Sequence, residues 1–120
     1  MSVELLPTSE VILRVITKAR SRENQANRRA DRRYSLHARV GLGKCDPTTR
    51  KFVKRADAWA RNISHSGMLL VVEEGMEPET AIDVDLEGLG FPGYYVSARA
   101  MRCNQLLPNT YEIGICFLEG

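Results

Sequence analysis

The sequence predicts a mainly β fold, an antiparallel barrel or sandwich of six strands preceded by one α-helix. Three observations support this fold class. An apolar stripe at helical spacing lies near the N-terminus, apolar and polar residues alternate from residue 34 onward, and turn residues separate the alternating segments. Short strands with turns between them are typical of antiparallel barrels and sandwiches. A chain of 120 residues fits one domain with its own hydrophobic core.

The helix is predicted over residues 9–24. Thr8 or Ser9 can cap it, and Glu10 would lie favourably in its first turn. Its apolar stripe consists of Val11, Ile12, Val15, Ile16 and Ala19, and its opposite face carries Arg14, Lys18, Arg20 and Arg22. Because the stripe is narrow, we expect the helix either to cover an open end of the barrel or to pack on a partner.

The six strands are predicted from alternation or, in the third, from a short apolar run. They cover residues 34–42, 56–63, 68–72, 81–86, 94–102 and 111–117. The turn signals between them include Asp46-Pro47, Glu77-Pro78, the glycines and proline of residues 88–93, and Pro108-Asn109. The polar segment 43–54 is predicted as a loop. Trp59 is expected to point away from the alanine face of the second strand, into the core, a rim or a partner surface.

Positive charge is concentrated at the N-terminal end of the chain. The formal net charge is only +2, yet residues 1–33 carry eight Arg or Lys against four Asp or Glu. A local basic segment indicates either an anionic partner or a solvated arm.

The cysteines and the apolar segments bear on cellular location. Cys45, Cys103 and Cys116 form no CxxC pair, and an odd number argues against a disulfide framework. We expect them to be small core residues. No apolar stretch reaches the ~18 residues of a membrane span, and the acidic residues Glu4 and Glu10 do not fit a secretory leader. A cytoplasmic location is therefore expected.

Residues 28–33 read RRADRR, with four arginines directly before the first predicted strand. Arginine presents a planar fork of donors that fits phosphate oxygens, and the same fork fits the O6/N7 edge of guanine. Arg29 and Arg33 are four residues apart, as are Arg28 and Arg32. Such a pair could hold two groups of one ligand, and the alternative is a solvated arm.

Residues 62–67 read NISHSG and lie between the second and third predicted strands. The Asn62 amide and the Ser64 hydroxyl can both donate and accept hydrogen bonds. Gly67 allows a positive φ or a close backbone approach. The alternative is an ordinary hairpin turn, because Asn, Ser and Gly are common turn residues.

Together, in this order and ahead of alternating strands, the two segments resemble the PilZ domain family. The family is marked by RxxxR near its start and by [D/N]xSxxG downstream, matched here by residues 29–33 and 62–67. The resemblance covers roughly residues 28–118, and residues 111–117 resemble the family's closing strand. It divides the chain into a helix and linker, residues 1–27, and a barrel domain, residues 28–120.

The resemblance implies a six-stranded antiparallel β-barrel that binds the bacterial second messenger cyclic di-GMP. It implies that Arg29 and Arg33 hold phosphate and guanine, while Asn62, Ser64 and Gly67 line the other side of a guanine. Arg28, just before the motif, implies an intercalated ligand dimer. Further candidate ligand residues are Arg32, His65 and Ser66. The two segments should then meet around a pocket.

The chain departs from the family in two respects. The family often adds a helix after the last strand, whereas the predicted helix here precedes the barrel and could replace that element or form a homodimer surface. Position 62 is Asn, which lacks the carboxylate that could accept two guanine donors at once, so a modest affinity is expected.

No catalytic or metal site is predicted. His65 lies between two serines, but sequence neighbours do not make a proton relay, and no Gly-x-Ser-x-Gly elbow is present. His37 is expected to face solvent. Asp83, Asp85 and Glu87 form one polar face that is either solvated surface or a cation site. We expect no enzyme activity and no cofactor.

The leading hypothesis is a cyclic di-GMP receptor in which the ligand orders the 24–33 segment and moves the helix, passing the signal to a downstream protein partner. The alternatives are a small nucleic-acid-binding barrel and a protein-interaction module. The near-neutral total charge and the lack of an aromatic row on the strands disfavour nucleic acid.

Overall fold

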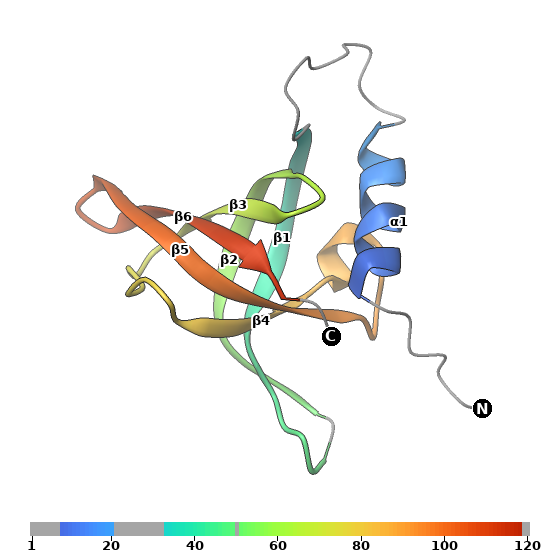
Figure 1. Cartoon of the computed structure of the whole chain (residues 1–120). Coiled ribbons are helices and arrows are strands. Elements are labelled where there is room, and N and C mark those ends of the chain that lie inside the picture. Colours follow the sequence, from blue (N-terminus) through green and yellow to red (C-terminus); the bar gives the residue numbers. More distant parts are fainter. Residues whose placement is uncertain (1–7, 21–32, 50, 119–120) are drawn as a thin grey trace.

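The residues that the structure describes form one α-helix, a short 3₁₀ turn and six β-strands (Figure 1). The computed structural model describes residues 8–20, 33–49 and 51–118. The helix and turn are α1 (Thr8–Arg20) and η1 (Glu87–Leu89), and the strands are β1 (Tyr34–Cys45), β2 (Phe52–Ile63), β3 (Gly67–Val72), β4 (Ala81–Asp85), β5 (Tyr95–Leu107) and β6 (Thr110–Phe117).

The strands close into a barrel in the order β1-β2-β3-β6-β5-β4, and every neighbouring pair is antiparallel. The prediction of a six-stranded antiparallel barrel with an N-terminal helix is therefore confirmed. Between the barrel and sandwich alternatives, closure decides for the barrel. In a closed sheet the inward side chains of all strands form one core.

The core follows the predicted alternation. Each strand contributes fully buried apolar side chains to one cluster, among them Val40, Leu70, Val84, Val96 and Ile113. Ala58 and Ala60 are also buried, but Ala56 is exposed. Trp59 is 44% exposed and belongs to the outer face, so of the three places considered for it, the core is excluded.

Strands β1 and β2 are longer than predicted. Residues 43–54, predicted as a loop, instead belong mostly to a hairpin whose arms pair from Gly43↔Lys54 to Cys45↔Phe52. Backbone hydrogen bonds between strands need no apolar side chain. The arms are polar, so the alternation of apolar and polar residues could not predict them. β5 likewise runs on to Leu107, paired with β6. The two long hairpins extend in different directions from the barrel (Figure 1).

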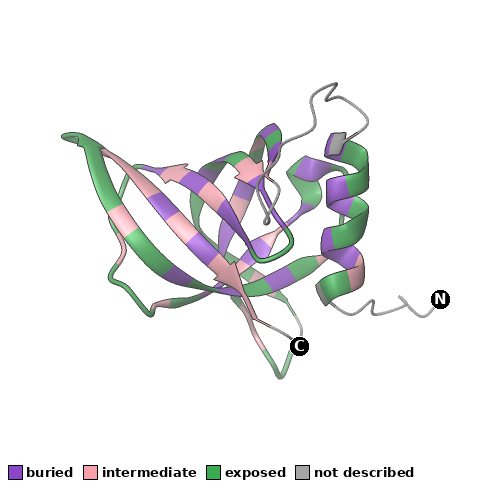
Figure 2. Cartoon of the chain, turned by 45° about the horizontal axis from the view of Figure 1, so that its top comes forward, coloured by how far each residue is buried: buried purple, intermediate pink, exposed green. Residues whose placement is uncertain are grey.

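Helix α1 packs on its own barrel. Val11, Ile12, Val15, Ile16 and Ala19 are buried in the same cluster as the inward residues of the strands, as predicted from their spacing. Figure 2 shows the buried residues on the side of α1 that faces the barrel and exposed residues on the opposite side. Within this chain the apolar stripe is therefore already covered. The last residues of the predicted helix, 21–24, lie outside the described residues.

One long-range polar contact also holds α1 to the barrel. Lys18 Nζ donates to the carbonyl oxygen of Leu89 in η1 at 3.2 Å and lies 5.6 Å from the centre of the Phe91 ring. The described residues include no helix with the length and apolar character needed to span a bilayer.

Candidate ligand-binding site

Of the predicted arginine motif, the structure describes Arg33 alone. Arg28, Arg29 and Arg32 lie outside the described residues. Arg33 directly precedes β1 and is half-buried. Arg33 therefore carries its guanidinium group at the N-terminal end of β1, where the barrel begins.

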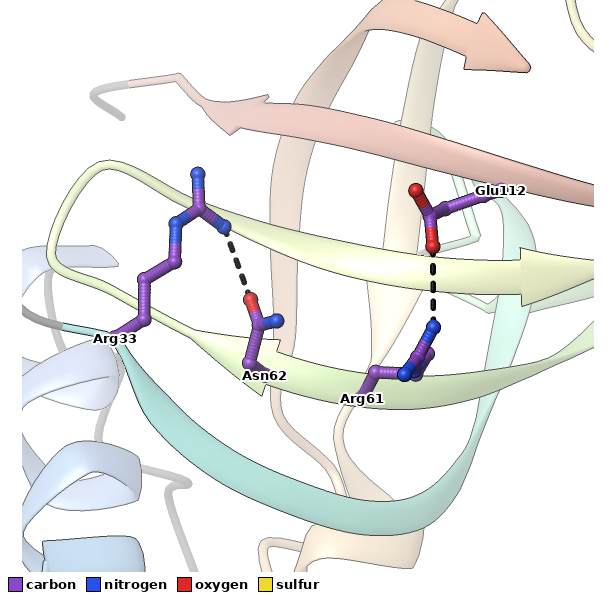
Figure 3. A network of polar contacts seen from close by, with 4 residues as sticks. All are labelled: Arg33, Arg61, Asn62 and Glu112. Carbon is purple, nitrogen blue, oxygen red and sulfur yellow. Dashed lines mark hydrogen bonds and ion pairs between the residues drawn. The ribbon is translucent and has the colours of Figure 1, made fainter.

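Asn62 lies next to Arg33, at the end of β2. The β1–β2 register pairs Ser35 with Asn62 and Tyr34 with Ile63. Arg33 Nη1 donates to Asn62 Oδ1 at 2.9 Å, in a partly buried contact between residues 29 positions apart (Figure 3). The prediction that the two motif segments meet in space is confirmed for Arg33 and Asn62.

Ser64 organises the turn between β2 and β3. It is fully buried, and its Oγ accepts hydrogen bonds from the backbone N–H groups of Ser66 and Gly67, both at 3.2 Å. Its own N–H donates to the carbonyl oxygen of Gly67 at 2.8 Å. The result is a tight hairpin turn with His65 and Ser66 exposed at its tip. The family resemblance implied that Ser64 lines a guanine, and in the structure its hydroxyl shapes the turn.

Gly67 satisfies one of its two predicted requirements. Its φ is not positive, since the described residues with positive φ are Glu79, Gly90 and Gly93. A Cβ at Gly67 would instead overlap the carbonyl oxygen of Ile115 on the neighbouring strand β6. Glycine is therefore needed for a close approach between two strands, and this approach sets the position of the turn.

A β-bulge decides which way Asn62 points. Along β2–β3, Ala60 pairs with Leu70 and Asn62 pairs with Leu69, so Arg61 is the extra residue. A bulge re-aims the side chains that follow it. It lets the consecutive residues Arg61 and Asn62 both lie outside the core while Ile63 remains fully buried. Simple alternation could not have predicted this.

Arg61 brings a further polar contact to the same face. Its Nη1 donates to Glu112 Oε2 on β6 at 3.1 Å, across strand β3 (Figure 3). The Arg61 side chain is 52% exposed, so solvent screens this ion pair and its contribution to stability is small. It does offset the charge of Glu112, which lies on β6 in the same view as the Arg33–Asn62 pair (Figure 3).

Three cavities in the described part of the chain have linings that include neither Arg33 nor Asn62. One of about 670 Å³ opens between β2 and the segment after β3, where Arg55 and Glu74 line it. One of about 530 Å³ lies between α1 and β1, and one of about 330 Å³ lies beside Trp59. The expected pocket between the two motifs is not one of these three, although Ser35, which pairs with Asn62, lines the second. Arg61 and Asn62 lie outside the core, so the candidate site is described as an outer face of the barrel.

The remaining candidate residues are held by local contacts. Asp83 accepts hydrogen bonds from the Cys45 N–H at 2.7 Å and from the Ser97 hydroxyl at 2.8 Å. Among the described residues, no three His, Cys, Asp or Glu side chains gather to hold a metal ion. The three cysteines are free and half-buried, and His37 is exposed, as predicted.

Tyr95 lies outside the candidate site and has a shifted pKa. The pKa of Tyr95 is raised, first by burial and then by the charges of Asp85, Cys45 and Glu87. The Tyr95 ring stacks on Phe52 with ring centroids 5.0 Å apart. This stack joins the β1–β2 hairpin to β5.

The geometry therefore gives an outer barrel face with Arg33 and Asn62 in contact, a hydrogen-bonded turn directly after Asn62 and a cation–carboxylate pair across β3. Comparison of the chain with protein-family models and with curated proteins found no match.

Proposed function

We propose that this chain is a PilZ-type receptor that binds cyclic di-GMP on the outer face of its barrel. The observation that carries the proposal is the hydrogen bond between Arg33 and Asn62. It joins, on one face of a closed barrel, the two short motifs on which the family resemblance depends. A chance occurrence of either motif would not require this contact.

The chemistry of the ligand suits these groups. Cyclic di-GMP carries two phosphates and two guanines, which are respectively anionic and rich in acceptors. A guanidinium group offers five donors in a fixed fork. One Arg33 nitrogen donates to Asn62, which orients the fork while leaving donors for the ligand. The Asn62 amide NH₂ would then donate to an acceptor on guanine.

Other residues complete the proposed site. Arg28, Arg29 and Arg32 would contribute from the segment that leads into β1. His65 and Ser66, exposed at the tip of the turn, would contact the ligand from the other side. Ser64 and Gly67 contribute by fixing the turn. Ligand stoichiometry, one molecule or an intercalated pair, is open to measurement.

The proposed output is a change in how α1 sits on the barrel. Residues 21–33 connect α1 to β1, so ligand contacts to the arginines in this segment would fix the connection. A ligand can shift the position of α1 only as far as it prefers one arrangement over another. The contact of Lys18 with η1 is one polar contact that such a shift would break. A cytoplasmic protein partner would read the exposed side of α1.

Isothermal titration calorimetry with cyclic di-GMP tests the proposal. Wild type should bind, with an affinity that falls as salt is added because charges attract the ligand. Arg33→Ala should weaken binding by about 1.5–3 kcal/mol, or roughly 10- to 150-fold, since hydrogen bonds to a charged group are lost. The Arg29→Ala/Arg33→Ala double variant should bind more weakly still.

Arg55→Ala is the matched control, because it removes the same charge on the same barrel. Arg55 is exposed on β2, seven residues from Asn62, and it lines the cavity of about 670 Å³ rather than the candidate site. Its affinity should equal that of wild type. Wild type that gives neither heat nor a thermal shift at saturating ligand would refute the proposal, and a gel shift with single-stranded RNA would then test the nucleic-acid alternative.

A further inference from the structure

Strand β5 carries a bulge at the same level of the sheet as the bulge in β2, and strands β3 and β6 lie between the two. Along β5–β6, Ala100 pairs with Ile115 and Arg102 pairs with Gly114, so Met101 is the extra residue. As in β2, the bulge puts two consecutive residues outside the core, and both Met101 and Arg102 are exposed. Bulges occur preferentially beside functional sites.

The two bulges end the same row of residues. Asn62 pairs with Leu69, Leu69 pairs with Gly114, and Gly114 pairs with Arg102. The row therefore crosses the outer face of β2, β3, β6 and β5, with a polar side chain at each end. Adjacent strands are about 4.8 Å apart, so the backbones at the two ends are separated by roughly 14 Å.

The middle of this row is low and uncharged. Leu69 is half-buried, and Gly114 has no side chain. A Cβ at Gly114 would lie 3.5 Å from Arg102 Nε and 3.6 Å from Nη2, but 4.0 Å from Cζ. The edge of the guanidinium that carries two parallel N–H donors therefore points into the space above Gly114.

Arg102 also differs from its neighbours in charge pairing. Arg61 pairs with Glu112 and Arg99 pairs with Glu79. Within the described part of the chain, Arg102 has no carboxylate partner. A two-donor edge without a counter-ion, aimed over a glycine, fits a group that offers two adjacent acceptors.

We infer that Arg102 binds the O6/N7 edge of the second guanine of cyclic di-GMP, above Gly114. This inference rests on the proposed function. The two guanines lie at opposite ends of the ligand, with the phosphates between them. If Asn62 holds one guanine, the ligand would extend along the row and the second guanine would lie toward Arg102. Arginine with guanine O6 and N7 is a common bidentate pair.

The affinity of Arg102→Ala for cyclic di-GMP, measured by calorimetry, is the first test. The variant should bind roughly tenfold more weakly than wild type, which corresponds to one bidentate contact at an exposed site. Arg102→Lys should show nearly the same loss, because lysine keeps the charge without the fork. Because residue 102 is exposed, both variants should keep the wild-type unfolding midpoint.

A second ligand distinguishes the base from the phosphates. Cyclic GMP-AMP has the same phosphates but only one guanine, and adenine lacks the O6 acceptor. Wild type should prefer cyclic di-GMP to cyclic GMP-AMP by roughly the factor lost in Arg102→Ala, and Arg102→Ala should lose that preference. Equal weakening for both ligands would mean a phosphate or a purely electrostatic contact and would overturn the inference.

Gly114→Val tests the space itself. A Cβ there makes only ordinary contacts and valine suits a strand, so the variant should fold while its branched side chain fills the space that the base would occupy. Its affinity should fall about as much as that of Arg102→Ala. If wild type binds cyclic di-GMP and both Arg102→Ala and Gly114→Val bind it as tightly as wild type, this inference alone is refuted. If wild type does not bind, the proposed function and the inference are refuted together.

Discussion

At the scale of single residues, burial decides what a motif residue can do. Ser64 has no exposed surface, and its hydroxyl accepts two backbone hydrogen bonds within its own turn. Asn62, two residues earlier, remains partly exposed and contacts Arg33. Thus one motif supplies both a partly exposed polar group and the turn that follows it.

Ser64→Ala should therefore lower stability. The buried N–H of Gly67 and the partly buried N–H of Ser66 would lose their acceptor, and an unsatisfied buried donor costs about 1–3 kcal/mol. Urea denaturation would measure the change. Ser66→Ala serves as the control, since Ser66 is exposed, and it should change stability less. If Ser64→Ala kept full stability and lost only ligand affinity, the structural assignment of Ser64 would be wrong.

At the scale of secondary-structure elements, α1 and the barrel depend on each other. An isolated helix of 13 residues is marginal in water, so α1 gains its stability by burying its apolar stripe. That stripe joins the same cluster as the strands. Any ligand effect on α1 must therefore compete with this packing.

Ile16→Ala should destabilise the whole domain by about 2–5 kcal/mol, the usual cost of truncating a buried aliphatic side chain. Ile16 is 2% exposed, whereas Leu13 on the same helix is 47% exposed. Leu13→Ala should change the free energy of unfolding by only about 0.5 kcal/mol. Equal effects of the two variants in thermal or urea unfolding would contradict the observed orientation of α1.

At the scale of the whole molecule, protection is expected to follow the barrel order. Strand β3 is paired with β2 on one side and with β6 on the other, and strand β6 is paired with β3 and with β5. The ends of the β1–β2 hairpin, Lys44↔Val53 and Cys45↔Phe52, are paired only with each other. Local opening should therefore begin at this hairpin.

Native-state hydrogen exchange would measure this difference. The backbone amides of Leu70, Ile113 and Ile115 should exchange most slowly, because they lie in doubly paired strands beside buried side chains. The amides of Lys44 and Val53 should exchange orders of magnitude faster. Uniform protection across the six strands would contradict this account of the barrel.

The sequence by itself determined the number of strands, the helix and its buried face. These depend on the local spacing of apolar residues, which can be taken directly from the sequence. It also placed two polar motifs where a closed sheet could bring them together. Only the tertiary structure decided how far the polar hairpin arms extend, which way Asn62 and Arg102 point, and that Ser64 is buried. These features depend on backbone pairing between distant strands, where one extra residue reverses the face of a side chain, and no local pattern records the pairing partner.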